Sequence, residues 1–234
     1  MAVDEIRTKL KKLGNRERAN ASQKYFKTGP GEYGEGDVFL GIKVPDIRKL
    51  AKAYRDIPLS EVRQLLKSSI HEERLFALLV LVQAYARGNE SEKERIYKLY
   101  LKHTKFVNNW DLVDTSAGHI VGHFLANRSK EPLYTLAKSP VLWERRIAIM
   151  STSYFIGRHE FTETLKISKV LLSDAEDLIH KAVGWMLREV GKRDLKTEEK
   201  FLKRYYKKMP RTMLRYAIER FPEPKRQRYL KGVI

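Results

Sequence analysis

Apolar residues recur at intervals of three and four positions along most of this chain, and no segment sustains an alternation of apolar and polar residues. The first spacing gathers apolar side chains on one face of an α-helix, whereas alternation would indicate a half-buried strand. Short stretches containing Gly, Pro, Ser or Asp separate the periodic segments, so we predict an all-α chain. The predicted helical segments are Ile6–Leu13, Ile47–Tyr54, Val62–Leu66, Leu75–Tyr85, Ile96–Tyr100, Leu112–Leu125, Leu142–Ile156, Leu165–Leu172, Leu178–Val190, Phe201–Tyr206 and Met213–Phe221.

A repeat runs through this helical pattern. Its register positions, spaced by 34 to 36 residues, are Arg74, Trp110, Arg146, Lys181 and Arg215. Helix pairs of this size build α-solenoids, and the second helices of the pairs line one concave face. Four of the five positions are basic, so we predict an α-solenoid with a concave basic face, formed as a single domain over residues 1–234. The competing interpretation is a set of helix surfaces that are basic only because Lys and Arg are abundant.

The glycine-rich segment Lys27–Gly41 interrupts the helices. Its glycines exclude a helix, because glycine in a helix interior costs about 1 kcal/mol relative to alanine. Such a segment could bring backbone amides to a phosphate, but no Gly-Lys-Ser/Thr follows, and Glu32, Glu35 and Asp37 would repel an anion. We therefore expect a surface connection that becomes ordered near a ligand.

The charge of the chain is the strongest indication of its partner. Among 234 residues, 47 are Lys or Arg and 29 are Asp or Glu, which gives a formal net charge of +18. Such an excess of positive charge favours nucleic acid as the partner. No apolar run approaches the roughly 20 residues of a membrane-spanning helix, and the first residues lack the apolar core of a signal peptide. The absence of cysteine excludes disulfides, thiolate metal sites and cysteine nucleophiles. We expect a cytoplasmic monomer with no membrane association.

Trp110 and Asp114 are the leading candidates for chemistry. Four residues apart on a helix, an indole and a carboxylate lie on the same face. In isolation this pair is more often a core tryptophan and a surface or Arg-paired aspartate. The repeat changes that balance, because Lys181 and Trp185 show the same spacing and Arg146 shares their predicted face. Two indoles, a carboxylate and basic neighbours suit a flat cationic ligand carried on a polyanion, since an indole attracts a cation by about 0.5–2 kcal/mol.

The other candidate groups give weaker evidence of a functional site. His119 and His123 have a spacing that can bind metal, but the His-Glu-x-x-His pattern is absent, so no metal site is expected. Ser151 and Ser153 lack the surroundings of a hydrolase nucleophile. Residues 201–208 combine aromatic and basic side chains, and two interpretations stay open there: a solvated face over packed rings, or a surface for a nucleic-acid backbone.

The chain resembles the AlkD-like family of DNA alkylation repair proteins, which are HEAT-repeat DNA glycosylases. The resemblance spans residues 20–220 and rests on four motifs in order. These are Phe39-Leu40-Gly41-Ile42 with Pro45 and Arg48, Asn109-Trp110-Asp111-Leu112-Val113-Asp114, Trp143-Glu144-Arg145-Arg146, and Lys181-Ala182-Val183-Gly184-Trp185-Met186-Leu187-Arg188-Glu189. The glycine-rich segment departs from the family pattern and marks a subgroup.

The resemblance implies excision of cationic purines alkylated at N3 or N7, without a cofactor, from double-stranded DNA. It assigns the catalytic aspartate to Asp114, the aromatic pair facing the lesion sugar to Trp110 and Trp185, and a supporting backbone contact to Arg146. The residues expected to contact DNA are Tyr25, Arg74, Lys181, Arg188 and Arg215. The alternatives are a non-catalytic protein that binds damaged or branched DNA, and a helical-repeat protein scaffold.

Overall fold

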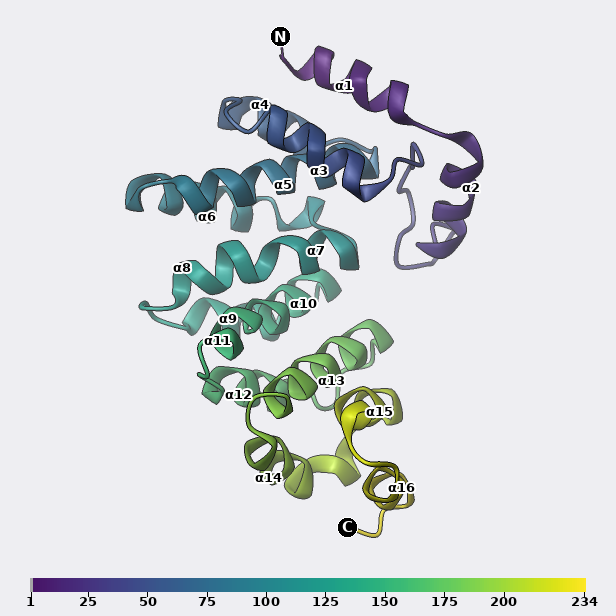
Figure 1. The fold of residues 1–234 in the computed structure, drawn as a ribbon, viewed down its shortest axis with the longest axis vertical. Coiled ribbons are helices and arrows are strands. Elements are labelled where there is room, and N and C mark those ends of the chain that lie inside the picture. The colour runs from purple at the N-terminus through teal and green to yellow at the C-terminus, as the bar shows by residue number, and fades with distance from the viewer. Residues whose placement is uncertain (1) are drawn as a thin grey trace. The chain divides into compact units, whose positions relative to one another are not determined.

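The chain folds into two compact units, Met1–Ser116 and Ala117–Ile234, in a computed structural model that describes residues 2–234 (Figure 1). Apart from an isolated parallel bridge between Val38 and Ile70, the regular elements of the described residues are helices. The all-α prediction is therefore confirmed. The single domain over residues 1–234 and the concave basic face stay predictions.

The first unit is built around one helix that is buried on every side. In α5 (His71–Arg87), every residue from 71 to 81 is buried, because the run from Leu75 to Leu81 is apolar all round and needs neighbours on each face. α3, α4 and α6 pack on α5, and α1 packs on both α4 and α5 (Figure 1). The helices of this unit are α1 (Ala2–Leu13), α2 (Arg16–Tyr25), α3 (Val44–Ala53), α4 (Leu59–Leu66), α5, α6 (Glu90–Lys102), the short η1 (Thr104–Phe106) and α7 (Trp110–Ala117).

The second unit is organised around α13 (Asp177–Gly191). This helix has a strongly amphipathic pattern, and its apolar face packs against α10, α14 and α15 (Figure 1). The other elements of the unit are the π-helical turn η2 (Gly118–Gly122), α8 (His123–Leu125), α9 (Glu131–Ala137), α10 (Leu142–Ser151), α11 (Ser153–Gly157), α12 (Thr162–Val170), α14 (Leu195–Tyr205), η3 (Tyr206–Lys208), α15 (Arg211–Ala217), η4 (Ile218–Arg220) and α16 (Glu223–Lys231).

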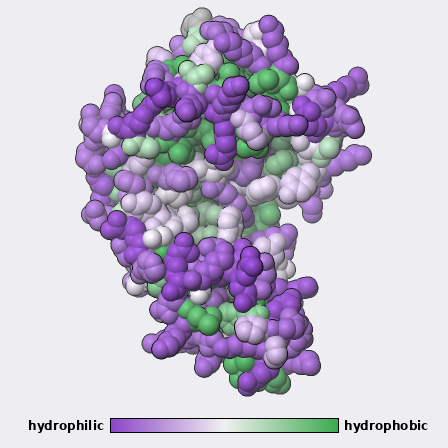
Figure 2. All heavy atoms as spheres, in the orientation of Figure 1, coloured by the Kyte–Doolittle hydropathy of each residue, from purple (hydrophilic) through white to green (hydrophobic). Residues whose placement is uncertain are grey.

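The surface is mainly hydrophilic on the face shown in Figure 2, where apolar residues form only limited areas. None of the described helices is both long enough and apolar enough to cross a membrane.

Two glycines test the packing of the second unit. A β-carbon on Gly184 of α13 would lie 2.4 Å from the carbonyl oxygen of Met213 and 2.5 Å from the β-carbon of Tyr216, so this glycine lets α13 and α15 approach closely. A β-carbon on Gly157, at the end of α11, would meet no atom within 4 Å.

We predict that Gly184→Ala lowers the free energy of unfolding by about 1–3 kcal/mol, because the added methyl forces the two helices apart. Gly157→Ala is the matched control and should be neutral or stabilising by up to about 1 kcal/mol. Urea unfolding followed by circular dichroism measures both. Equal stability of the two variants would contradict the close packing of α13 and α15.

Candidate nucleic-acid repair site

Trp110 and Asp114 lie one turn apart on α7. Trp110 opens the helix, and its backbone N–H donates to the side-chain oxygen of Asn109, 2.8 Å away. Leu112 and Val113 are fully buried, whereas Trp110 and Asp114 are only partly buried. The helix therefore turns its apolar side into the first unit and keeps the indole and the carboxylate near the surface, as the sequence predicts.

Aromatic rings from the glycine-rich segment and the end of α2 surround this indole. The Phe26 ring stacks on Trp110 at 5.2 Å between centroids, and Phe39 in turn stacks on Phe26 at 4.9 Å. Tyr25 meets Trp110 edge-on at 6.1 Å and is 68% exposed. The structure thus brings together two predicted site residues, Tyr25 and Trp110, and adds Phe26 between them and the interior.

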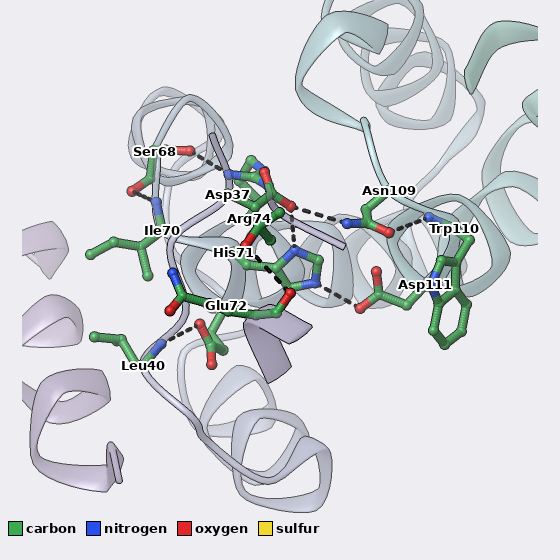
Figure 3. Close-up of polar contacts among 12 residues, drawn as sticks. Asp37, Leu40, Ser68, Ile70, His71, Glu72, Arg74, Asn109, Trp110 and Asp111 are labelled. Carbon is green, nitrogen blue, oxygen red and sulfur yellow. Dashed lines mark hydrogen bonds and ion pairs between the residues drawn. The ribbon is translucent and has the colours of Figure 1, made fainter. Parts of the chain in front are cut away.

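A buried aspartate of the glycine-rich segment binds polar groups from α5 and from Asn109, the residue directly before α7 (Figure 3). Asp37 accepts hydrogen bonds from the Arg74 guanidinium at 2.5 Å, the His71 ring at 3.0 Å and the Asn109 amide at 3.1 Å. Burial disfavours its charge, but the hydrogen bonds from His71 and Asn109 and the charge of Arg74 prevail and lower the pKa of Asp37. The expected surface connection is thus anchored in the interior by a charged residue.

His71 joins this aspartate to α7. Its ring is 2% exposed, and its second nitrogen, Nε2, lies 2.7 Å from the carboxylate of Asp111 (Figure 3). Burial opposes a charged ring, yet the hydrogen bonds to Asp111 and Asp37 outweigh it and raise the pKa of His71 above its ordinary 6.5. The Phe39 ring stacks on this imidazole at 4.4 Å.

A second buried carboxylate binds the end of the glycine-rich segment. Glu72 accepts hydrogen bonds from the backbone N–H groups of Leu40, Gly41 and Ile42, at 2.9, 2.7 and 3.2 Å. Gly41 has a φ of +76°, and a β-carbon there would lie 2.3 Å from the Asn15 carbonyl oxygen, so glycine is required at this turn. These amides are therefore already occupied by a carboxylate and do not form a phosphate cradle.

The predicted residues of the second unit lie on α10, α13 and α15. Lys181 and Trp185 are partly buried on α13, where Lys181 pairs with Asp177 at 2.7 Å and the Trp185 indole donates to Glu189 at 3.3 Å. Arg188 forms an ion pair with Glu219 and is mostly buried, whereas Arg215 on α15 is exposed.

Two predicted arginines are interior residues. Arg74 is 3% exposed and binds Asp37 and the carbonyl oxygen of Ser68, so it is not available as a surface contact to DNA. Arg146 is 4% exposed and donates to the carbonyl oxygen of Leu178, at the start of α13. A guanidinium buried in this way serves packing and hydrogen bonding, so Arg74 is corrected from a DNA contact to a structural residue.

The helix boundaries also correct the register of the repeat. Arg146, Lys181 and Arg215 are each the fifth residue of their helices and Arg74 is the fourth, whereas Trp110 is the first residue of α7. A list of equivalent positions therefore contains Asp114, the fifth residue of α7, in place of Trp110. Where the other repeats carry a basic residue, this one carries the carboxylate.

Metal ligation has no cluster to support it: within residues 2–234, no three His, Asp or Glu side chains group as ligands would. His119 is exposed and His123 packs against the Tyr154 ring at 4.8 Å.

Comparison with known families decides the relationship. The family described as DNA alkylation repair enzyme matches residues 6–221. The chain belongs to this DNA alkylation repair enzyme family. No curated protein matches the sequence.

Solved structures support the same fold. A predicted DNA alkylation repair enzyme from Enterococcus faecalis is 20% identical with a TM-score of 0.68, and the match covers 90% of this chain and 98% of that one. AlkD2 from Streptococcus mutans is 18% identical with a TM-score of 0.55, over 95% and 98% of the two chains. The smu.31 protein from Streptococcus mutans UA159 is 18% identical with a TM-score of 0.54, over 95% and 100%. The helix-pair architecture predicted for this DNA alkylation repair family member agrees with these folds.

Sequence reasoning missed the residues beneath Trp110. Their signal was present: His71-Glu72-Glu73-Arg74 places four charged residues directly before an apolar run, and all four are buried. Charged residues are seldom fully buried without partners, so such a stretch at the start of a core helix predicts ion pairs. Their partners could not be identified, because Asp37 and Asp111 are distant in sequence.

The amide contacts of Glu72 generate a stability prediction. Glu72→Gln should lower the free energy of unfolding by about 1–3 kcal/mol, because an amide has one acceptor oxygen for three buried N–H groups. Glu61→Gln is the control, since Glu61 is only partly buried and, among the described residues, accepts one backbone hydrogen bond, from the N–H of Val3 at 3.0 Å. Urea unfolding measures both variants. A Glu72→Gln protein no less stable than Glu61→Gln would contradict the anchoring role.

Proposed function

We propose that this protein is a monofunctional DNA glycosylase that hydrolyses the N-glycosidic bond of cationic N3- or N7-alkylated purines in duplex DNA. The observation that carries the proposal is the partly exposed pair Trp110 and Asp114 on one face of α7, in a member of the DNA alkylation repair enzyme family. The net charge of +18 supports a polyanionic substrate.

Breaking the glycosidic bond to a cationic purine needs little acid catalysis. A purine alkylated at N3 or N7 is already positively charged, so the electron pair of the breaking C1′–N bond neutralises the departing base. The positive charge then develops on the deoxyribose, as in glycoside hydrolysis. A carboxylate near that sugar stabilises it electrostatically, and this is the role we assign to Asp114.

Water completes the reaction. Asp114 orients a water molecule toward C1′, the new C1′–O bond forms, and the excess proton leaves through the carboxylate. To Trp110 and Trp185 we assign the role that the family resemblance implies, because the π face of an indole beside the sugar would favour its cationic form. No lysine stands beside Asp114 in the sequence, so an imine intermediate and strand cleavage are not expected.

The remaining predicted residues bind or support. Tyr25 extends the aromatic surface at Trp110. Lys181 and Arg188 hold phosphates once DNA competes with Asp177 and Glu219, and the exposed Arg215 binds a phosphate as well. Arg146 acts indirectly, through the carbonyl oxygen of Leu178 at the start of the helix that carries Trp185.

Base release tests the catalytic assignment. Asp114→Asn should reduce the single-turnover rate of 7-methylguanine and 3-methyladenine release from methylated DNA by about 100- to 1,000-fold, because the amide cannot offset the sugar cation. Asp46→Asn, an exposed aspartate on α3, makes the same charge change and should release base like the wild type. Normal release by Asp114→Asn would contradict the assignment. Salt-sensitive DNA binding without base release by the wild type would instead favour a non-catalytic DNA-binding protein.

Salt dependence tests the DNA contacts. Arg215→Gln should reduce the slope of log affinity against log salt concentration by about 1, because one phosphate contact is lost. Lys169→Gln is the control, since Lys169 is equally exposed but lies on α12, outside the repeat register. Fluorescence anisotropy with a labelled duplex at several salt concentrations measures the slopes. Equal slopes for wild type and Arg215→Gln would mean that Arg215 makes no contact with a DNA phosphate.

A further inference from the structure

The interior of the first unit holds four charged side chains in one cluster, the Asp37 cluster: Asp37, His71, Arg74 and Asp111. Asp37, His71 and Arg74 are each less than 5% exposed, and the Asp111 side chain is 17% exposed. A charge removed from water is costly unless it is paired. Two carboxylates against one guanidinium leave a net negative charge, so the cluster is balanced only when His71 is an imidazolium. Both ring nitrogens then donate, each to a carboxylate, as the geometry requires.

Within residues 2–234, the hydrogen bond described for the Asp111 side chain is the one to Nε2 of His71. The other oxygen of Asp111 is buried without a hydrogen-bond partner among these residues. Asp111 directly follows Trp110 in the first turn of α7. The start of α7 is therefore joined to the Asp37 cluster twice: through the His71–Asp111 bond, and through Asn109, whose side chain binds both Asp37 and the backbone N–H of Trp110.

The same cluster fixes the rings that cover the indole. Asp37 lies two residues before Phe39, and Phe39, Phe26 and Trp110 form a continuous stack in which the imidazole of His71 contacts both phenylalanines. The glycine-rich segment carries no helix or strand that would hold it in place. Its described polar anchors to the rest of the unit include Asp37, the backbone of Val38, which bonds to Ser69 and His71, and the amides bound by Glu72. At its end, the carbonyl oxygens of Leu40 and Gly41 also accept hydrogen bonds from Asn15 and Arg18.

We infer that His71 is a positioning residue: it ties the glycine-rich segment 27–41 to the start of α7 and thereby makes that segment a fixed wall of the site at Trp110. That this wall borders a catalytic site rests on the proposed function, but the hydrogen-bonded tie itself does not. Loss of the tie frees the Asp111 carboxylate and leaves Asn109 as the remaining polar link between the cluster and Trp110. Loss of Asp37 removes that link too and frees the segment with Phe39.

Protonation of His71 controls the tie. The groups that face its ring are Asp37 from the glycine-rich segment, Asp111 from α7, Arg74 from its own helix and the uncharged rings of Phe26 and Phe39. Because its pKa is raised in the folded protein, the stabilising contribution of His71 is complete below 6.5 and is lost as the pH rises through the folded pKa. The segment should therefore loosen on the alkaline side.

The test uses two readouts that need no DNA. In a Trp143→Phe, Trp185→Phe background, Trp110 is the only tryptophan, and acrylamide quenching reports its exposure. Glutamyl endopeptidase reports opening of the segment by cleavage after Glu32 and Glu35, both exposed. We expect His71→Gln and Asp37→Asn to raise quenching about twofold and cleavage roughly tenfold, because each substitution weakens the hydrogen bond between His71 and Asp37 that orders the segment. Asp111→Ala should raise quenching alone.

His103→Gln is the matched control. His103 is a buried histidine of the same unit, but its Nδ1 bonds to the carbonyl oxygen of Leu99 rather than to a carboxylate. It should leave both readouts at their wild-type values. Asp111→Ala, at a less buried position, keeps the test decisive if His71→Gln does not fold. Unchanged quenching in folded Asp111→Ala, or in folded His71→Gln, would overturn the positioning role.

Kinetics separate positioning from simple stability. With methylated DNA, Asp111→Ala should lower the single-turnover rate by about 10- to 100-fold and leave DNA affinity within about threefold, because a misplaced indole affects the transition state more than binding. Equal losses of rate and affinity would overturn the role. Absence of base release by the wild type would instead refute the proposed function and leave the quenching result to decide the tie.

Discussion

The structure of the first unit depends on the compensation of charge at the start of α5. Four consecutive charged residues begin this helix, and the apolar run behind them pulls the whole turn into the interior. Each charge must then find a partner, since an unpaired buried charge costs about 3–5 kcal/mol once its partner is removed. The partners come from three places: Arg7 on α1 for Glu73, the backbone of residues 40–42 for Glu72, and Asp37 for His71 and Arg74.

The consequence is that a segment without regular structure becomes a defined part of the molecule. Phe39 is the one buried apolar side chain described in residues 27–41, yet Asp37 and the Glu72-bound amides hold the segment beside the stack of Phe39, Phe26 and Trp110. The carboxylates of Glu32 and Glu35 also bind amides within the segment, of Gly29 and Gly31. The acidic residues that argue against a phosphate loop thus have a structural explanation: they order the segment that contains them.

The helices of the core were predictable, because burial on one face leaves a period in the sequence. Helices that bury almost nothing leave no such period and could not be predicted. α2 has no buried residue, and the Asn15 side chain caps it by accepting a hydrogen bond from the backbone N–H of Arg18. α16 buries only Tyr229. At the site, Trp110, Asp114 and Tyr25 could be proposed from spacing and resemblance. Asp37, His71 and Asp111 could not, because the pairing of buried charges joins residues 34 to 40 positions apart and leaves no local pattern. Arg74 illustrates the same limit in reverse, since a basic residue in register looks like a surface contact until its partner is known.

A buried, charged histidine links the groups around Trp110 in this structure. Nitrogen-15 NMR of histidine-labelled protein tests it most directly, with His71→Gln to assign the resonance. At about pH 6.5, where an ordinary histidine is half protonated, the raised pKa of His71 predicts that its imidazolium form, with both ring nitrogens protonated, predominates. Ring-nitrogen resonances of a mainly neutral imidazole at that pH would contradict a charged, paired His71.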